Sequence, residues 1–376
     1  MTSWKIYRLG DICTLNYGKS LTATNRVAGD IPVYSSAGIT GSHNVALVQS
    51  KGIIVGRKGT VGTVYYSDKP FYCIDTAYYI LPDDEKYDFK WLYYRLKSLH
   101  LDKLNEDSAV PGLNRETAYA QEFPLPSLEE QRRIAGILGA IDDKIENNRR
   151  INTNLELQAQ ALFEELICDE NLKYEYIANL EHIIETGRRP KGGVANIANG
   201  VPSIGAENIK GLGKYDYSKT KYITEEFAQS LKKGFVKGYE LLIYKDGGKP
   251  GYFIPNFSIF GEGFPYEKMA LNEHVFLLDF GDRGYNFFAY FYMQTEEVMK
   301  YLNAQGSKAA IPGINRNDVE SIAIPTIENK TVKEFCARVE PIISAILTNA
   351  KESSRLATLR DTLLPKLMNE EIKVAE

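Results

Sequence analysis

The sequence lacks the features of a membrane or secreted protein. No stretch approaches the roughly 18–20 consecutive apolar residues that a membrane-spanning helix needs. The N-terminus has no apolar run of the kind found in a secretory signal. The four cysteines lie far apart and form no Cys-x-x-Cys pair, which argues against a disulfide framework or a zinc site. These absences predict a cytoplasmic protein with no membrane contact.

Motifs of the common DNA-modifying and nucleotide-using enzymes are also missing. Neither Asn-Pro-Pro nor Asp-Pro-Pro occurs, so the motif with which amino-methyltransferases hold adenine is absent. The pairs Gly18-Lys19 and Gly248-Lys249 lack the earlier glycine of a P-loop. The four histidines are scattered and form no metal-binding pattern. We therefore expect no catalytic site, no bound cofactor and no metal on this chain.

The composition is that of a globular protein without a strong overall charge. Of the 376 residues, 44% are apolar and 25% are charged, and this length predicts two domains plus helices. The net charge is −4, and residues 129–170 alone carry five Lys and Arg against ten Asp and Glu. The acidic excess thus lies in one segment. Any nucleic-acid surface must come from local clusters of basic residues.

A heptad pattern occurs twice, 201 residues apart, with polar residues in the middle of both copies. Its apolar positions recur in alternating steps of four and three, which is typical of a helix that pairs with another helix. The positions that we expect at the helix-pair interface are Ile134, Leu138, Ile141, Ile145, Asn148, Asn152, Leu155 and Leu162 in the first copy, and Phe335, Val339, Ile342, Ile346, Asn349, Ser353, Leu356 and Leu363 in the second.

The polar centres suggest how the two helices pair. Antiparallel pairing about a two-fold axis brings Asn148 opposite Ser353 and Asn152 opposite Asn349, so each buried polar group finds a partner. Parallel pairing also matches the two centres, and symmetry alone does not decide between them. We favour the antiparallel pair, in which a duplicated unit closes on itself about a pseudo-two-fold axis.

Local signals set the limits of the two helices. Ser127 and Thr331 each have a glutamate three residues on, which predicts a capping box at each helix start. Because Pro365 lacks a backbone donor and clashes with the preceding turn, we expect the closing helix to end near Leu364. Leu367, the next position of the second heptad pattern, would then lie beyond the end of the helix.

A strand-rich segment of ordinary domain size precedes each long helix. Similar heptapeptides, residues 109–115 and 310–316, stand ahead of the two helices with the same offset of 201. Expected strands are Ile31–Tyr34, Gly52–Val55, Thr63–Tyr66, Ala77–Leu81, Val201–Ile204, Leu241–Tyr244, Tyr252–Ile254 and Val275–Asp279. The predicted class is α+β, with two similar globular domains (1–126 and 169–326) separated by two long antiparallel coiled-coil helices (127–168 and 327–376) and an internal pseudo-two-fold.

Five segments resemble a known family. The runs at Pro126–Ala135, Ile141–Ile145 and Gln160–Phe163 resemble the central helix of the specificity subunit of Type I restriction–modification enzymes. Leu363–Met368 resembles the C-terminal ending of that family, and Tyr7–Asp11 resembles the opening of one of its target-recognition domains. The resemblance covers the whole chain in the family's order of domain, helix, domain, helix.

That resemblance implies a function and a set of partners. Each target-recognition domain would read one half of a bipartite, asymmetric site in double-stranded DNA. The helices would dock two methyltransferase subunits and, through them, restriction subunits that translocate and cut DNA. Methylation in this family is of adenine; S-adenosylmethionine, ATP and Mg are expected on the partner subunits and no cofactor on this chain. We therefore expect a non-catalytic recognition subunit in the cytoplasm.

Basic residues in Gly-bearing loops are the candidates for DNA contact. Two cations and a hydroxyl on the turn at residues 57–60 can approach phosphates or base edges, and the loop at residues 245–251 is its counterpart. Arginines of the heptapeptides can read guanine, whereas their asparagines also fit helix caps; the alternative for each loop is a solvated surface. The candidates are Lys19, Arg57, Lys58, Thr60, Arg115, Arg188, Arg189, Lys191, Lys245, Lys249, Lys308 and Arg316.

Two other classes of function stay open. A free-standing DNA nuclease or methyltransferase would act on DNA without a partner subunit. A coiled-coil scaffold that does not bind DNA would lack a cationic concave face on its globular domains.

Overall fold

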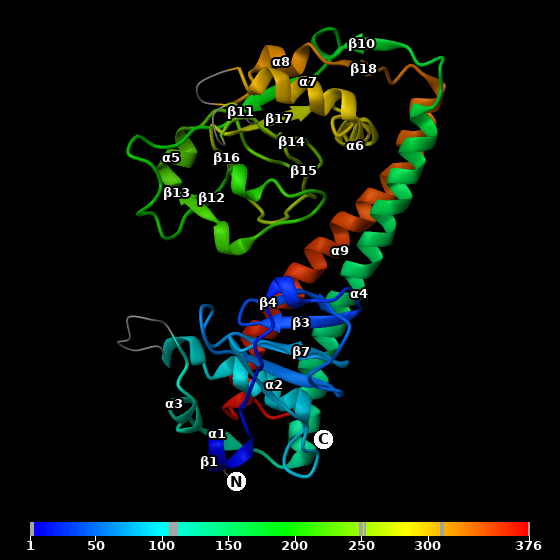
Figure 1. Ribbon diagram of the computed structural model, residues 1–376. Coiled ribbons are helices and arrows are strands. Elements are labelled where there is room, and N and C mark those ends of the chain that lie inside the picture. Colours follow the sequence, from blue (N-terminus) through cyan, green and yellow to red (C-terminus); the bar gives the residue numbers. More distant parts are fainter. Residues whose placement is uncertain (1–3, 105–111, 248–250, 252, 309–311, 375–376) are drawn as a thin grey trace. The chain divides into compact units, whose positions relative to one another are not determined.

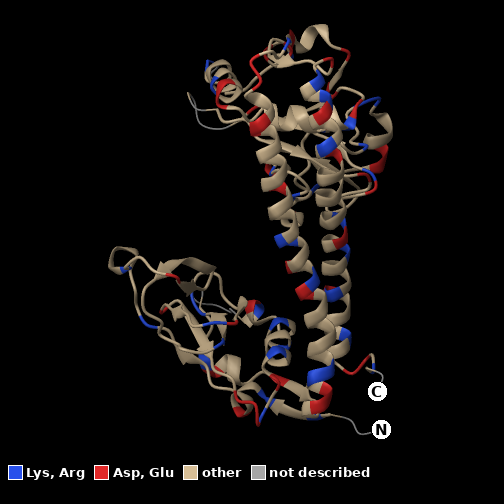
Figure 2. Ribbon diagram, turned by 90° about the vertical axis from the view of Figure 1, so that its right-hand side faces the viewer, with Lys and Arg blue, Asp and Glu red and all other residues tan. Residues whose placement is uncertain are grey.

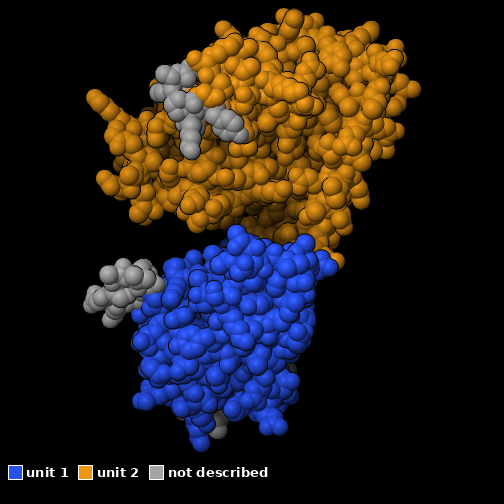
Figure 3. All heavy atoms as spheres, viewed as in Figure 1, with its two compact units in different colours: residues 1–143, 356–376 blue, residues 144–355 orange. Residues whose placement is uncertain are grey.

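The computed structural model describes residues 4–104, 112–247, 251, 253–308 and 312–374. The chain forms two compact units (Figure 3): unit 1 comprises residues 1–143 and 356–376, and unit 2 comprises residues 144–355. The divisions fall inside the two long helices, so each unit holds one globular domain and a piece of both helices.

Both globular domains are α+β (Figure 1). The elements in unit 1 are β1 (Lys5–Arg8), α1 (Leu9–Ile12), β2 (Asn16–Tyr17), β3 (Ile31–Ser35), β4 (Gly38–His43), β5 (Gly52–Gly56), β6 (Val64–Ser67), β7 (Tyr72–Cys73), β8 (Ala77–Ile80), α2 (Phe89–Ser98), α3 (Arg115–Tyr119) and β9 (Glu122–Leu125). Those in unit 2 are β10 (Tyr174–Tyr176), β11 (Ile183–Thr186), β12 (Val201–Ile204), β13 (Lys221–Ile223), α5 (Glu225–Ser230), β14 (Leu241–Tyr244), β15 (Phe257–Ile259), β16 (Ala270–Leu271), β17 (Val275–Asp279), α6 (Arg283–Tyr292), α7 (Glu296–Gly306), α8 (Arg316–Glu320) and β18 (Ala323–Pro325).

The second domain repeats the strand order of the first. In unit 1 the sheets run β2-β8-β5-β6, β4-β3-β7 and β1-β9; in unit 2 they run β11-β17-β14-β15, β13-β12-β16 and β10-β18. The four-stranded sheets are antiparallel, and in each three-stranded sheet the central strand has one antiparallel and one parallel neighbour. The internal duplication is therefore confirmed.

The two long helices, α4 (Leu128–Ile167) and α9 (Lys330–Met368), run antiparallel. In unit 1, Arg360 Nη1 donates to Asp142 Oδ1 at 2.7 Å. In unit 2, Asn349 Nδ2 donates to Asn152 Oδ1 at 2.8 Å. In unit 2, Lys144 pairs with Glu352, Asn152 with Asn349 and Glu165 with Arg338, so positions further along α4 meet earlier positions of α9. The predicted fold class with antiparallel helices is therefore confirmed. The pseudo-two-fold relation between the copies stays a prediction.

A polar layer lies in the middle of the helix pair of unit 2. Asn148 is 1% exposed, and its Nδ2 donates to Ser353 Oγ at 3.2 Å and to Glu352 Oε2 at 2.7 Å. Lys144 Nζ pairs with the same Glu352 oxygen at 3.1 Å. These contacts lower the pKa of Glu352. Asn148 thus lies against Ser353, which is the polar partner that antiparallel register gives it.

Apolar candidates for the helix-pair interface are buried to different degrees. Ile134, Leu138, Phe335, Val339 and Ile346 are buried, whereas Ile141, Ile145, Leu155, Leu162, Ile342, Leu356 and Leu363 are half-buried. In unit 2, Ile343 and Leu347 are also buried, in the same core cluster as the sheet residues of that domain. Helix α9 therefore carries a second apolar stripe, which packs on the domain and which the heptad pattern did not predict.

Expected helix ends were partly wrong. The capping box at Ser127 is confirmed, since its backbone N and Oγ both contact Glu130. Helix α9 instead begins at Lys330, and Thr331 lies inside it with its hydroxyl donating to Asp169. The predicted box at Thr331 is therefore absent, because the helix starts one residue before it.

The closing helix does not end before Pro365, as the sequence predicted, but continues to Met368. Leu367 is 2% exposed and belongs, with Met368, to the core cluster of unit 1. Proline removes one backbone donor and crowds the carbonyl four residues earlier; Asp361, which carries that carbonyl, is exposed to solvent. Burial of the two apolar side chains therefore outweighs the cost of the proline.

One expected strand was misplaced. Strand β15 is Phe257–Ile259, and the expected strand at residues 252–254 begins at a residue outside the described ones. Phe253 is instead fully buried against Tyr244, and its carbonyl accepts from the side chain of Asn303 on α7. The Asn303 side chain thus makes the hydrogen bond to the Phe253 carbonyl that a neighbouring strand was expected to make.

Replacing the polar layer with leucine should stabilise the helix pair of unit 2. The substitutions are Asn148→Leu, Asn152→Leu, Asn349→Leu and Ser353→Leu. Exchange of a buried polar network for apolar side chains is often stabilising, so we expect the melting temperature to rise by on the order of 5 °C, with a less unique register. Circular dichroism at helical wavelengths measures the transition.

A matched control changes polar residues of α4 that are exposed. Asn147→Leu with Asn154→Leu adds the same kind of side chain outside the interface and should leave the melting temperature within about 2 °C. A lower melting temperature in the quadruple variant would show that the four positions do not pack against each other.

Candidate nucleic-acid interface

In unit 1, the basic turn after β5 lies against the heptapeptide that precedes the first long helix. The backbone N–H groups of Arg57 and Lys58 donate to Thr76 O at 2.9 and 3.0 Å, which continues the pairing of β5 with β8. Leu113 N donates to Arg57 O at 2.8 Å, and Lys58 forms a bridge with Gly112. Two segments more than 50 residues apart therefore meet at one edge of the four-stranded sheet.

Stacking on tyrosines holds the two arginines of this edge. The Arg57 guanidinium lies 4.9 Å from the Tyr17 ring centroid and 5.7 Å from that of Tyr78, and its Nη1 donates to Asp75 O at 3.1 Å. Arg115 lies 5.3 Å from the same Tyr17 ring. Contacts of this kind, between a guanidinium and an aromatic face, restrict the side chain without neutralising its charge.

The edge of unit 1 is a polar cleft of about 640 Å³ that is lined by Tyr17, Arg57, Lys58, Tyr78, Leu104 and residues 112–117. Burial raises the pKa of Tyr78, which is protonated and donates to Leu113 O at 3.1 Å. Among the described residues, no carboxylate lies within ion-pair distance of Arg57 or Lys58, and Arg115 has only Glu116 at 3.7 Å. The cleft therefore carries positive charge that is free to meet an anion or a base acceptor.

Other candidates of unit 1 lie outside the lining of this cleft. Lys19 is exposed, with its backbone N donating to Cys73 O at 2.9 Å, and Thr60 is exposed in the turn after Gly59. Gly59 has φ +79°, the left-handed region that glycine adopts readily. Asn114 accepts from Glu116 N at 2.8 Å and caps α3, so the predicted capping role of the heptapeptide asparagine is confirmed.

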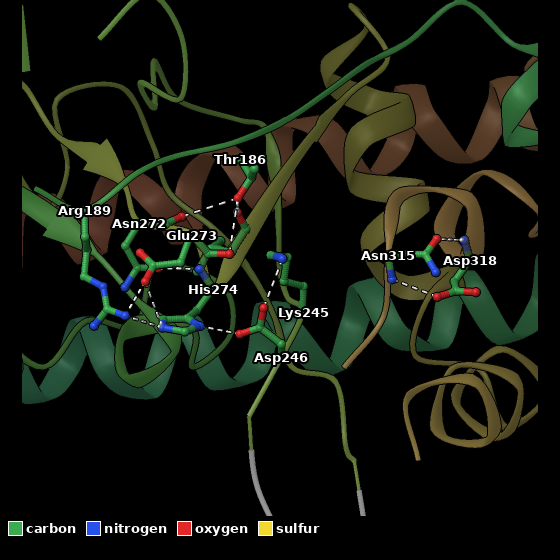
Figure 4. Close-up of polar contacts among 10 residues, drawn as sticks. Thr186, Arg189, Lys245, Asp246, Asn272, Glu273, His274, Asn315 and Asp318 are labelled. Carbon is green, nitrogen blue, oxygen red and sulfur yellow. Dashed lines mark hydrogen bonds and ion pairs between the residues drawn. The ribbon is translucent and has the colours of Figure 1, made fainter. Parts of the chain in front are cut away.

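Unit 2 builds the same junction from equivalent residues. Lys245 N donates to His274 O at 3.0 Å, and Ile314 N donates to Lys245 O at 2.7 Å, as at Arg57 and Leu113. Asp246 forms the bridge with Gly313 that Lys58 forms with Gly112. Asn315 accepts from Asp318 N at 3.2 Å and caps α8 (Figure 4). Lys245 thus takes the place of Arg57, and Asp246 that of Lys58.

The loop after β11 is likewise equivalent to the loop after β2. A Cβ on Gly18 would lie 2.1 Å from Ile74 O, and one on Gly187 would lie 1.6 Å from Leu271 O. Only glycine fits where these strands leave the sheet, because any side chain would collide with the backbone. The basic residues that follow, Lys19 in one copy and Arg188 in the other, are both exposed.

Two basic candidates of unit 2, Lys245 and Arg189, are engaged with acids. Lys245 Nζ lies 3.0 Å from Asp246 Oδ2, and Arg189 pairs with Glu273 Oε1. His274 lies between the two carboxylates, with Nδ1 toward Asp246 and Nε2 3.3 Å from Glu273 Oε1 (Figure 4). A network of three bases and two acids therefore occupies this edge.

The remaining candidates are spread over the second domain. Arg188 and Arg189 line a cleft of about 510 Å³ with Pro190, Gly193 and Glu273. Lys191 and Lys308 are exposed, and Lys308 Nζ donates to Gln305 Oε1 at 2.7 Å. Arg316 pairs with Glu320 at 2.8 Å, and Lys249 lies outside the described residues. The structure therefore gathers Arg189 and Lys245 into one network and places Arg188 in the same cleft as Arg189, whereas the described contacts of Lys308 and Arg316 lie outside that network.

Sequence reasoning missed the aromatic and acidic members of both edges. Tyr17 and Tyr78 hold the arginines of unit 1, and Asp246, Glu273 and His274 form the network of unit 2. The sequence did contain a signal for the acidic network. When the turns at 57–60 and 245–248 are aligned across the duplication, Lys58 in the first copy corresponds to Asp246 in the second. Both basic and acidic residues occur along the ribbon of the long helices (Figure 2).

Neither a membrane span nor a metal cluster is found in the part of the chain that the structure describes. There, no helix combines the length and apolar character needed to cross a bilayer, and no group of three or more His, Cys, Asp and Glu side chains is placed to hold a metal.

Comparisons with known proteins point to one family. A family model described as the Type I restriction modification DNA specificity domain matches residues 1–157. The Type I restriction enzyme MjaIX specificity subunit of Methanocaldococcus jannaschii is 25% identical over 345 residues, which cover 86% of this chain and 78% of that protein. The HindI specificity subunit of Haemophilus influenzae is 21% identical over 340 residues, which cover 71% of this chain and 72% of that one.

A solved structure shares the fold over nearly the whole length. The S subunit of a Type I restriction–modification system from M. genitalium aligns with a TM-score of 0.63 over 99% of this chain and 97% of that chain, at 17% identity. The shared fold and the two relatives, which align over most of the chain, agree with the duplicated order of domain and helix. The chain is thus similar over most of its length to Type I restriction–modification specificity subunits, and its residues 1–157 match their DNA specificity domain.

Proposed function

We propose that this chain is the DNA-reading subunit of a Type I restriction–modification complex, and that each globular domain reads one half of a bipartite, asymmetric site in double-stranded DNA. The observation that carries this proposal is the repeated junction. In each domain, backbone hydrogen bonds join two segments. One is the charged loop that follows β5 or β14, and the other is a Pro-Gly-x-Asn-Arg segment. Such a junction presents side chains that can meet phosphates and base edges.

Helices α4 and α9 serve in this proposal as a spacer between the two readers. Helix α4 has 40 residues, which at 1.5 Å per residue gives a length of about 60 Å. This length exceeds the roughly 34 Å of one turn of DNA. Base pairs between the two half-sites would then be spanned without being read.

The same helices offer surfaces for two methyltransferase subunits. Ile151 and Leu157 of α4 are exposed in unit 2, and Ile137 of α4 and Leu359 of α9 are exposed in unit 1. Exposed apolar residues on an otherwise polar helix suit a protein partner. Restriction subunits would attach through the methyltransferases. S-adenosylmethionine, ATP and Mg would be bound by those partners, and the methylated base would be adenine.

Methylome sequencing tests the proposed function. Cells that express this chain with the methyltransferase subunit of its own system should show modified adenines in one split motif, and cells that express either protein alone should show none. A motif that appears with this chain alone would support a free-standing methyltransferase. Cleavage of DNA by the purified chain with Mg and ATP would support a nuclease, and the absence of any motif in the co-expressing cells would support a scaffold that does not read DNA.

A further inference from the structure

At the edge of the four-stranded sheet where the turn meets the heptapeptide, equivalent positions of the two domains carry charges of opposite sign. Lys58 and Asp246 form the same backbone bridge to the heptapeptide glycine of their own domain, yet one is a cation and the other a carboxylate. Thr76 and His274 also correspond, since their carbonyls accept from Arg57 N and Lys245 N. The two domains therefore present different chemistry from one backbone scaffold.

Asp246 is fixed by two basic neighbours from the same edge. Its Oδ2 accepts from Lys245 Nζ at 3.0 Å, and its Oδ1 faces Nδ1 of His274 within hydrogen-bond distance (Figure 4). The side chain is 24% exposed. A carboxylate oxygen offers two acceptor positions, so each oxygen of Asp246 keeps one after these contacts. The carboxylate is thus oriented, partly open and still able to accept.

Further contacts hold the bases that orient Asp246. His274 Nε2 lies 3.3 Å from Glu273 Oε1, which also pairs with Arg189. His274 N donates to Asn272 Oδ1 at 2.8 Å, and Lys245 Nζ lies 5.1 Å from the Phe276 ring centroid. Thr186 Oγ1 donates to Val275 O at 2.9 Å beneath this edge. His274 and Lys245 are therefore positioning residues, which restrict the rotamer of Asp246.

A phosphate suits the edge of unit 2 less well than the cleft of unit 1. The charges of Lys245 and Arg189 are already engaged with carboxylates, and Asp246 and Glu273 would repel the phosphate. An oriented carboxylate matches a neutral donor instead. In the major groove, those donors are the exocyclic amino groups, cytosine N4 and adenine N6.

We propose that Asp246 is a specificity-determining residue of the second domain, which accepts a hydrogen bond from the exocyclic amino group of a cytosine or an adenine in the second half-site. This inference rests on the proposed function, since it needs a DNA half-site at this edge. In this proposal the first domain reads its half-site with Arg57 and Lys58, which have no carboxylate partner among the described residues, so the two halves of the target are recognised by opposite charges.

Asp246→Ala and Asp246→Asn test the assignment in the assembled complex. With the methyltransferase subunit co-expressed, the methylome of Asp246→Ala should show relaxed sequence preference at one base pair of one half-site, with the other half-site unchanged. Asp246→Asn keeps one acceptor oxygen without the charge and should relax the same base pair to a smaller extent. A relaxed G·C pair identifies cytosine, and a relaxed A·T pair identifies adenine. Arg57→Ala identifies the half-site of the first domain, so the relaxed pair must lie in the opposite half.

Glu181→Ala is the matched control. It removes an exposed carboxylate of unit 2 ahead of β11, whereas the edge lies after the end of that strand. This variant should leave the motif unchanged. The asparagine variant keeps the size of Asp246, so a relaxed motif in both Asp246 variants cannot be attributed to a cavity.

Removal of the amino group from the DNA tests the hydrogen bond itself. At the relaxed pair, a duplex with 2-pyrimidinone in place of cytosine, or purine in place of adenine, lacks the donor. The wild-type complex should bind this duplex about tenfold more weakly than the natural one. The Asp246→Ala complex should bind the two duplexes within about twofold of each other, because the acceptor is already gone.

Each negative outcome has a distinct meaning. If the wild-type complex produces no split motif, the proposed function fails before Asp246 is considered. If the wild type produces a split motif that Asp246→Ala leaves unchanged, or relaxes in the half-site read by Arg57, the assignment of Asp246 is overturned. Equal weakening of both complexes by the modified base would likewise overturn it.

Discussion

Replacing Arg57 and Lys58 together with alanine should remove recognition of one half-site and leave the other half-site intact. Arg57 is held by Tyr17, Tyr78 and Asp75 O at the edge of unit 1 without a carboxylate partner among the described residues, and Lys58 lines the same cleft. Since a good bidentate contact to a base contributes about 1–3 kcal/mol of discrimination, we expect affinity to fall about 100-fold for DNA that carries the full site.

Duplexes with one half-site scrambled at a time measure this effect in the assembled complex. For the double variant, scrambling the first half-site should change affinity less than twofold, while scrambling the second should still weaken binding strongly. The slope of log affinity against log salt should also fall by up to about 2, because two cations no longer meet phosphates.

The control for this variant is Arg8→Ala with Lys86→Ala. It removes two exposed cations of unit 1 that pair with Glu122 and Asp83 and lie outside the cleft lining. Its affinity should stay within about threefold of the wild type. If Arg57→Ala with Lys58→Ala weakens recognition of both half-sites equally, or of neither, the turn does not read the first half-site.

Periodicity and repetition carried the fold prediction. Alternating steps of four and three identify a paired helix whatever its surroundings, so both long helices could be placed from sequence alone. The repeat also fixed the equivalence of the two domains, which their shared strand order confirms. The polar centres left both directions open, and the antiparallel pair was favoured because a duplicated unit can close on itself. The contact of Asn349 with Asn152 agrees with that choice.

Tertiary context decided what local pattern could not. Helix α9 passes through Pro365 because Leu367 and Met368 are buried in unit 1, a gain that no local rule contains. The second apolar stripe at Ile343 and Leu347 exists because α9 packs on a domain as well as on α4. A heptad pattern predicts packing against one partner helix, whereas α9 packs against both α4 and the globular domain of unit 2.

Composition found the basic members of the candidate site but not their partners. Tyr17 reaches Tyr78 through the register of β2 with β8, a pairing across about 60 residues that sequence does not reveal. At the edge of unit 2, a basic loop looked available for DNA, yet Lys245 and Arg189 face Asp246 and Glu273. The sequence therefore predicted basic residues individually. Which of them are neutralised by a neighbouring carboxylate, and which can contact DNA, depends on the fold.

A second large effect is expected from Arg95→Ala, which should destabilise unit 1 by about 3 kcal/mol. Arg95 lies on α2, is 2% exposed, and donates to Met368 O at the end of α9 and to Pro124 O at 3.4 Å. Burial lowers its pKa to about 10, so it is charged at neutral pH. Truncation leaves a cavity and removes a cation from the negative end of a helix dipole.

Tryptophan fluorescence during urea unfolding reports this change selectively, because Trp4 and Trp91 are the two tryptophans of the chain and both belong to unit 1. Arg95→Lys keeps the charge and should recover about half of the loss, whereas Arg8→Ala, which breaks an exposed ion pair, should cost less than about 1 kcal/mol. Hydrogen exchange should accelerate in the last turn of α9 for Arg95→Ala alone. If the urea midpoint of Arg95→Ala falls no further than that of Arg8→Ala, the contacts of Arg95 do not stabilise the packing of α9 on the first domain.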